Sequence, residues 1–144
     1  MQIQIQRVNE AVHLKATNDQ GNVVLVDGSE KIGGQNLGVR PIQLLLVALG
    51  SCASMDVLSI LKKQRQEVDE YEVLVDGIRD DEKVPSLFKS IHVTFLLKGE
   101  LDIKKVHRAI DLSINTYCSV SKTLEKTAII TSSFKINDNE EQSI

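Results

Sequence analysis

The chain has 144 residues and a formal net charge of −3, from 17 basic and 20 acidic residues. Hydrophobic residues make up 42% of the sequence and charged residues 26%, which argues against intrinsic disorder. A chain of this length can bury one core without disulfides or metals, so we expect a single domain over residues 1–144. Aromatic residues are only 3% and no basic segment is concentrated, which argues against nucleic-acid partners.

The N-terminus, MQIQIQRVNE, lacks the charged-then-apolar pattern of a signal peptide. The longest unbroken apolar run, Leu44–Leu49, is far shorter than a membrane span. We therefore expect a cytoplasmic protein with no membrane partner. A reducing cytosol disfavours a stable structural disulfide but permits a transient catalytic one.

The first part of the chain, residues 1–40, is expected to contain three short strands and a loop. Alternating polar and apolar residues predict strands over Ile3–Val8 and Val12–Ala16, and a third apolar strand over Val23–Val26. Asp27–Arg40 holds four glycines and shows little periodicity, which predicts a long mobile loop of the kind that often carries function.

A long central helix is expected over residues 41–65. Pro41 suits the first turn of a helix, and basic residues near Arg65 suit its C-terminal end. From Leu44 to Cys52 the helix is apolar nearly all round, which is typical of a helix buried on every side. One small sheet covers one side only, so a second subunit is a reasonable source of cover for the other.

The second half, residues 69–136, is expected to contain two strands, two helices and a closing strand. These are placed at Tyr71–Ile78, Ile91–Leu97, a helix capped by Asp102 and running to Tyr117, Val120–Lys126 and Ala128–Ile136. The polar residues 137–144 are expected to form a frayed tail. Runs of like elements favour an α+β fold with an antiparallel sheet.

The two cysteines are the residues best suited to chemistry. A thiol attacks a peroxide as thiolate, which requires a helix N-terminus or a nearby cation. Cys118 precedes the short helix, whose dipole would favour its thiolate, whereas Cys52 needs a cationic neighbour, with Arg40, Arg7 and Lys31 as candidates. The alternative is that both are inert core residues, because free cysteine is among the most buried residue types.

No metal or cofactor is predicted from the linear pattern. The two cysteines and the isolated histidines His13, His92 and His107 show no metal-ligand spacing, and the glycines form no phosphate-binding motif. His92 is expected to face solvent from its strand, and His107 to lie on the exposed stripe of its helix.

Two segments carry a resemblance to a known family. They are Val39–Ala53, VRPIQLLLVALGSCA, and Tyr117–Lys122, YCSVSK. A proline that opens an apolar helix with a cysteine in it, and a second cysteine that opens a later helix, is a fairly specific pairing. With these segments the chain resembles the OsmC/Ohr family over roughly Ile3–Ile136, and most of all its shorter, less characterised OsmC-like subgroup.

The resemblance implies an α+β, OsmC-like fold, an intertwined homodimer whose antiparallel sheets wrap around the long central helices. It also implies thiol-dependent reduction of organic hydroperoxides in stress defence. By this analogy Cys52 attacks a small apolar hydroperoxide and becomes a sulfenic acid, and Cys118 condenses with it to a disulfide. A lipoylated or thioredoxin-like dithiol protein would reduce that disulfide.

The chain departs from the family pattern at the partners of the attacking cysteine. The family has a glutamate directly after the helix-opening proline, where this chain has Ile42, followed by the neutral Gln43. The family arginine comes from an early loop, but Asn18–Gly34 contains no arginine, and Arg40 is the nearest guanidinium. Arg40 and Gln43 are therefore the candidate supporting residues. Two other functions stay open, a non-enzymatic binding module for a hydrophobic small molecule and a thiol redox sensor.

Overall fold

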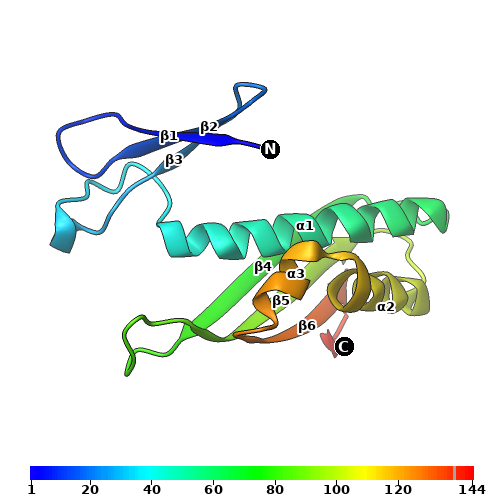
Figure 1. Ribbon diagram of the computed structural model, residues 1–144. Helices are drawn as coiled ribbons and strands as arrows, with labels where there is room; N and C mark the ends of the chain where they lie inside the picture. The colour runs from blue at the N-terminus through cyan, green and yellow to red at the C-terminus, as the bar shows by residue number, and fades with distance from the viewer. Residues whose placement is uncertain (138) are drawn as a thin grey trace. The chain divides into compact units, whose positions relative to one another are not determined.

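The computed structural model describes residues 1–137 and 139–144, and its elements follow the order shown in Figure 1. The described chain forms two compact units, Met1–Leu45 and Leu46–Ile144. Their boundary lies inside the long helix α1 (Pro41–Lys63), which begins at the predicted proline. Helices and strands in this order confirm the α+β class.

The N-terminal unit contains a three-stranded antiparallel sheet in the order β1-β2-β3. Its strands are β1 (Ile3–Arg7), β2 (Leu14–Asn18) and β3 (Val23–Val26), close to the predicted positions. The glycine-rich segment predicted as a mobile loop contains a short 3₁₀ helix, η1 (Glu30–Ile32), and a bridge between Val26 and Val39.

A buried carboxylate organises this glycine-rich segment. Asp27 is only 1% exposed, and its two oxygens accept hydrogen bonds from the backbone N–H groups of Gly28, Gln35 and Leu37 at 2.7, 2.9 and 3.0 Å. The bond from Leu37 is the main cause that holds the pKa of Asp27 below its usual value. The segment is thus folded around an ionised side chain, a feature that its glycines did not reveal.

The second unit contains a four-stranded sheet in the order β4-β5-β6-β7. Its strands are β4 (Glu70–Arg79), β5 (Phe88–Lys98), β6 (Ile129–Ile136) and β7 (Gln142–Ser143). The β4–β5 and β6–β7 pairs are antiparallel, whereas β5 and β6 are parallel. The sheet is therefore mixed, because the chain crosses from β5 to β6 through helices, and such a crossover returns a strand in the same direction.

Strand β7 lies in the tail that was predicted to fray. Gln142 and Ser143 pair with Phe134 and Ser133 of β6, so the tail returns to the sheet. Asp138, which belongs to the same predicted tail, lies outside the described residues.

Three helical segments connect β5 to β6. They are α2 (Ile103–Leu112), a π-helical turn η2 (Ser113–Tyr117) and α3 (Ser119–Leu124). Asp102 caps α2 as predicted, because its carboxylate accepts from the backbone N–H groups of Lys104 and Lys105. In Figure 1 these segments lie beside α1, on the same side of the sheet.

The core of the second unit lies between this sheet and the helices. Most of its fully or almost fully buried side chains come from alternate positions of β5, from one stripe of α1 and from α2, and β6 adds Phe134. Those on β5, α1 and α2 are Ile91, Val93, Phe95, Leu97, Leu49, Ala53, Val57, Leu61, Val106, Ala109 and Ile110. Gly50 sits where α1 packs closest to β4, since a Cβ atom there would lie 2.8 Å from Val75 Cγ2.

Several apolar side chains on the remaining surface of α1 are uncovered in a single copy of the chain. Val47 and Met55 are 55% and 72% exposed. An 18-residue window of α1 has a mean hydropathy of 2.1, and 28% of that window is buried. By length and composition alone, α1 is apolar enough to cross a membrane. Core helices of soluble proteins pass the same test. The prediction that α1 is buried on every side is therefore not met within one copy.

Candidate functional site

The fold brings the two cysteines together. The sulfurs of Cys52 and Cys118 and one carboxylate oxygen of Asp56 all lie within 4.8 Å of one another. Both thiols are free, with Cys52 half-buried in the middle of α1 and Cys118 fully buried directly before α3. Residues 66 positions apart in sequence thus form one cluster inside the second unit.

The π-helical turn η2 sets the position of Cys118. The backbone N–H of Cys118 donates to the carbonyl of Ser113 at 2.9 Å, a bond over five residues that widens the end of the helix. Cys118 then leaves the helical conformation, with φ −66° and ψ 103°, and caps α3. Its sulfur accepts from the N–H of Ser121 at 3.4 Å, which holds the thiol inward.

A second contact fixes η2 against α1 next to Cys52. The hydroxyl of Ser113 donates to the carbonyl of Ala53 at 3.1 Å and lies 3.5 Å from Asp56 Oδ2. Both Ser113 and Ala53 are fully buried, and the small alanine side chain allows this close approach. The helix that carries Cys52 and the turn that carries Cys118 are therefore joined directly.

Burial keeps Cys118 protonated. The pKa of Cys118 is raised to about 11, mainly by loss of hydration and next by the neighbouring Cys52 side chain. The N–H of Ser121 acts in the opposite direction but does not prevail. The start of α3 does favour the thiolate, as predicted, through the N–H groups of Ser121 and Val120, but burial outweighs this effect.

Asp56 is the member of the cluster that the sequence analysis missed. It follows Cys52 by four residues on α1, a spacing that places both side chains on one face of a helix. That spacing was the only available signal. A surface pocket of about 470 Å³ opens beside Asp56, with Lys63 and Tyr117 also in its lining.

Arg40 and Gln43, the candidate supporting residues, lie in the N-terminal unit and contact each other there. Gln43 Oε1 accepts from the backbone N–H of Arg40 at 2.8 Å. The Arg40 guanidinium donates to the carbonyl of Asp27 at 3.2 Å and to the side-chain oxygen of Asn36. These contacts tie the glycine-rich segment to the start of α1, and a role in thiol chemistry stays a prediction.

The histidines do not join the thiols. His92 is half-buried rather than turned wholly to solvent, because its ring nitrogens lie 2.7 Å from Thr131 Oγ1 and 2.8 Å from Ser133 Oγ. His107 is exposed, as predicted, with its ring edge-on to Phe134. Across residues 1–137 and 139–144, the cysteine–aspartate cluster is the one group of His, Cys, Asp and Glu close enough to share a metal ion.

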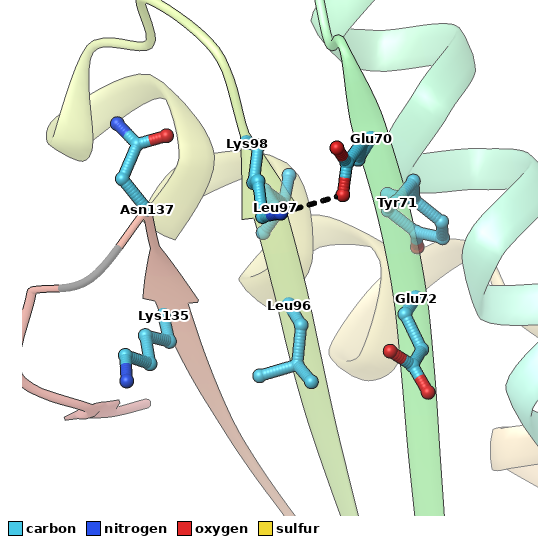
Figure 2. Close-up of a pocket in the computed structure, with 8 residues that line it drawn as sticks. All are labelled: Glu70, Tyr71, Glu72, Leu96, Leu97, Lys98, Lys135 and Asn137. Carbon is cyan, nitrogen blue, oxygen red and sulfur yellow. Dashed lines mark ion pairs between the residues drawn. The ribbon is translucent and has the colours of Figure 1, made fainter.

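A different pocket of about 550 Å³ lies over strands β4 and β5 and the end of β6. Figure 2 shows Lys135 and Asn137 on one side of it and an ion pair between Lys98 and Glu70, 2.7 Å long, on the other. The lining contains neither cysteine. The thiol cluster, which unites the two residues singled out from the sequence, is therefore the candidate site.

Known proteins place the chain in one family. The family model described as OsmC-like protein matches residues 33–133. Protein YhfA of Escherichia coli strain K12 is 38% identical over 117 residues, which is 81% of this chain and 84% of that protein. The structure is similar to a hypothetical protein from Aquifex aeolicus VF5, with a TM-score of 0.81 and 28% identity over 96% of this chain and 97% of the other.

A more distant likeness concerns the fold alone. An organic hydroperoxide resistance protein from Elizabethkingia anophelis, solved with thiocyanate bound, has a TM-score of 0.71 at 14% identity and covers 95% of this chain and 97% of its own. The family match over most of the chain confirms the resemblance read from the cysteine segments. The chain belongs to the family of OsmC-like proteins.

Proposed function

We propose that the protein is a cytoplasmic, thiol-dependent reductase of organic hydroperoxides that acts in stress defence. The observation that carries the proposal is the cluster of Cys52 and Cys118. Their sulfurs lie within 4.8 Å of each other, although Cys52 belongs to α1 and Cys118 directly precedes α3. The family supports it, since one structural relative is named an organic hydroperoxide resistance protein.

In the proposed reaction, Cys52 attacks the outer oxygen of ROOH, the O–O bond breaks, and the alcohol ROH leaves with the thiol proton. Cys52 is then a sulfenic acid. The Cys118 thiol condenses with it, which forms the disulfide and releases water. A dithiol reductant, a lipoylated or thioredoxin-like protein, takes up the two oxidising equivalents and restores both thiols.

The two cysteines have unequal environments that fit these roles. Cys118 is fully buried, and burial raises its pKa to about 11, so it remains a thiol at neutral pH. Cys52 is half-buried and can meet a small apolar hydroperoxide. Cys52 is therefore the attacking residue and Cys118 the one that completes the disulfide.

We expect the reaction to be slow or restricted to few substrates. Within the second unit, the group next to the thiols is the carboxylate of Asp56, and a negative charge there disfavours a neighbouring thiolate. Ile42 replaces the glutamate of the family pattern, so no ion pair can form from that position.

A homodimer is part of the proposal. Most of the apolar surface of α1, including Val47 and Met55, is uncovered in one copy. A second copy of the chain would cover it, and light scattering on the purified protein should give twice the 16.0 kDa chain mass. Val47→Glu should then shift the mass toward the monomer; a wild-type monomer would contradict this part of the proposal.

The proposed activity is tested by turnover. Reduced protein is mixed with cumene hydroperoxide and excess dihydrolipoamide, and peroxide loss is followed. Wild-type protein should consume many equivalents, more slowly with hydrogen peroxide, and Cys52→Ser should consume none above background. Consumption that persists in Cys52→Ser would contradict the proposal.

A thiol redox sensor is the second candidate, and the position of Asp56 favours it. A site that places a carboxylate rather than a cation beside its thiols is poorly built for rapid turnover. In that case one equivalent of hydroperoxide would form the Cys52–Cys118 disulfide, but added dithiol would give no sustained consumption. The same turnover assay therefore separates the two functions.

A further inference from the structure

The thiol cluster has a donor set that suits a metal ion as well as a redox reaction. Cys52 Sγ, Cys118 Sγ and an Asp56 carboxylate oxygen converge within 4.8 Å of one another from two different elements. We propose that the reduced protein binds one thiophilic divalent ion, Zn²⁺ by preference, through these three atoms. Two thiolates and one carboxylate are ligands that Zn²⁺ takes readily.

The spacing requires little movement. In a tetrahedral site with Zn–S bonds of about 2.3 Å, neighbouring sulfurs lie roughly 3.8 Å apart. The observed limit of 4.8 Å is therefore within about 1 Å of the required geometry, a shift that side-chain rotation can supply.

Electrostatics also favour a cation at this point. Metal binding exchanges the two thiol protons for the ion and leaves two thiolates beside a carboxylate, three negative charges in a partly buried cluster. Within the described part of the chain, Asp56 forms no ion pair with lysine, arginine or histidine. A divalent ion supplies the positive charge that the neighbouring side chains do not.

Contacts around the ligands hold them in place. The N–H of Ser121 donates to Cys118 Sγ, and the hydroxyl of Ser113 lies 3.5 Å from Asp56 Oδ2. Such surrounding hydrogen bonds orient metal ligands and raise affinity. Asp56 also lines the surface pocket of about 470 Å³, and three protein ligands leave a fourth position for water.

Metal binding and disulfide formation exclude each other, because both use the same two sulfurs. Metal occupancy would thus protect the thiols, and oxidation by a hydroperoxide would release the ion. The inference does not depend on the proposed peroxidase activity, since it concerns the reduced protein without peroxide.

The test is titration of the reduced, full-length protein with Co²⁺ under anaerobic conditions in a buffer without thiols. We expect one Co²⁺ per chain, with the visible bands of a tetrahedral ion and a near-ultraviolet thiolate-to-cobalt charge-transfer band. Zn²⁺ should displace the Co²⁺, and prior oxidation of the protein with diamide should abolish both bands. Absence of the charge-transfer band in the reduced protein would overturn the proposal, whatever the peroxide assay shows.

Variants assign the ligands. Cys52→Ser should lose about half of the charge-transfer intensity and bind Zn²⁺ at least roughly 100-fold more weakly, and Asp56→Asn should weaken Zn²⁺ binding roughly tenfold to 100-fold. Asp76→Asn, the same charge change at an exposed position of β4, is the matched control and should bind as wild type. Full charge-transfer intensity in Cys52→Ser, or equal affinity of Asp56→Asn and Asp76→Asn, would contradict the assigned ligands.

Discussion

Two acidic side chains are removed from water in this protein, Asp27 in the N-terminal unit and Cys118 in the second, and they respond in opposite ways. Asp27 is 1% exposed and Cys118 is 0% exposed. Asp27 accepts three backbone N–H bonds and its pKa is lowered, whereas Cys118 accepts one such bond, from Ser121, and its pKa is raised to about 11. Equal burial thus gives an anion in one place and a neutral acid in the other.

The two acids differ in their ordinary pKa, but the directions of their shifts show that three backbone N–H donors outweigh burial at Asp27, whereas burial prevails at Cys118. Asp27 uses its charge to fold the glycine-rich segment. Burial instead keeps the Cys118 thiol protonated at neutral pH, so it forms a disulfide or a metal–thiolate bond only by giving up that proton.

The largest effect is expected at the attacking thiol. Cys52→Ser should abolish both peroxide consumption and disulfide formation, because the serine hydroxyl forms neither a sulfenic acid nor a disulfide. Cys118→Ser should instead leave a sulfenic acid on Cys52 that dimedone traps, as intact mass spectrometry would show. Normal turnover of Cys118→Ser with a dithiol would mean that Cys118 does not complete the disulfide.

The next largest effect concerns the stability supplied by Asp27. Asp27→Asn removes the charge that three N–H groups share, so the midpoint of urea unfolding should fall clearly. The pKa of Asp27 is lower in the folded protein than in the unfolded chain, where it is about 3.9. The stabilisation is therefore present above about pH 3.9 and is lost as the pH falls through the pKa of the folded state. The gap between wild type and variant should therefore be constant above about pH 5 and shrink below about pH 4.

Asp19→Asn is the control for this prediction, since Asp19 is exposed in the turn before β3. It should leave the midpoint almost unchanged at every pH. An equal loss in both variants, or a gap for Asp27→Asn that does not close in acid, would show that the charge of Asp27 is not what stabilises the segment.

A smaller effect is expected from the carboxylate beside the thiols. Asp56→Asn removes a negative charge within 4.8 Å of both sulfurs, which makes a thiolate there easier to form. Alkylation of the metal-free protein by iodoacetamide at neutral pH should accelerate about threefold to tenfold. Asp76→Asn should not change the rate. A slower reaction in Asp56→Asn would indicate that the carboxylate accepts the thiol proton instead.

The smallest effect is expected where η2 joins α1. Ser113→Ala removes the bond to the Ala53 carbonyl and should cost about 1 kcal/mol of unfolding free energy, with slower disulfide formation because the sulfurs are held less closely. Ser59→Ala, at an exposed position of α1, is the control. If the two variants unfold alike, the Ser113 contact does not fix the cluster.

Much of the fold was predictable because its signals are local. Period-2 alternation marked β1, an apolar run marked β3, and Pro41 and Asp102 marked two helix starts. The parallel β5–β6 pair and strand β7 were missed, because pairing direction and a two-residue strand depend on distant partners rather than on local pattern.

The candidate site was predictable only in part. The family resemblance pointed to Cys52 and Cys118, and the structure places them together. Asp56 was missed because a single carboxylate on a helix has no motif, and the low acidity of Cys118 depends on burial that the sequence does not state. The role of Asp27 was hidden for the same reason, since its partners are backbone groups.

The central claim is that an organic hydroperoxide joins Cys52 to Cys118. The most direct measurement is stopped-flow oxidation of the reduced protein with one equivalent of cumene hydroperoxide, followed by intact mass and peptide mapping of the product. The account predicts the loss of two hydrogens and a single Cys52–Cys118 cross-link, formed faster than with hydrogen peroxide. Two thiols that stay free and unlinked, or Cys52 oxidised while Cys118 remains a free thiol, would contradict it.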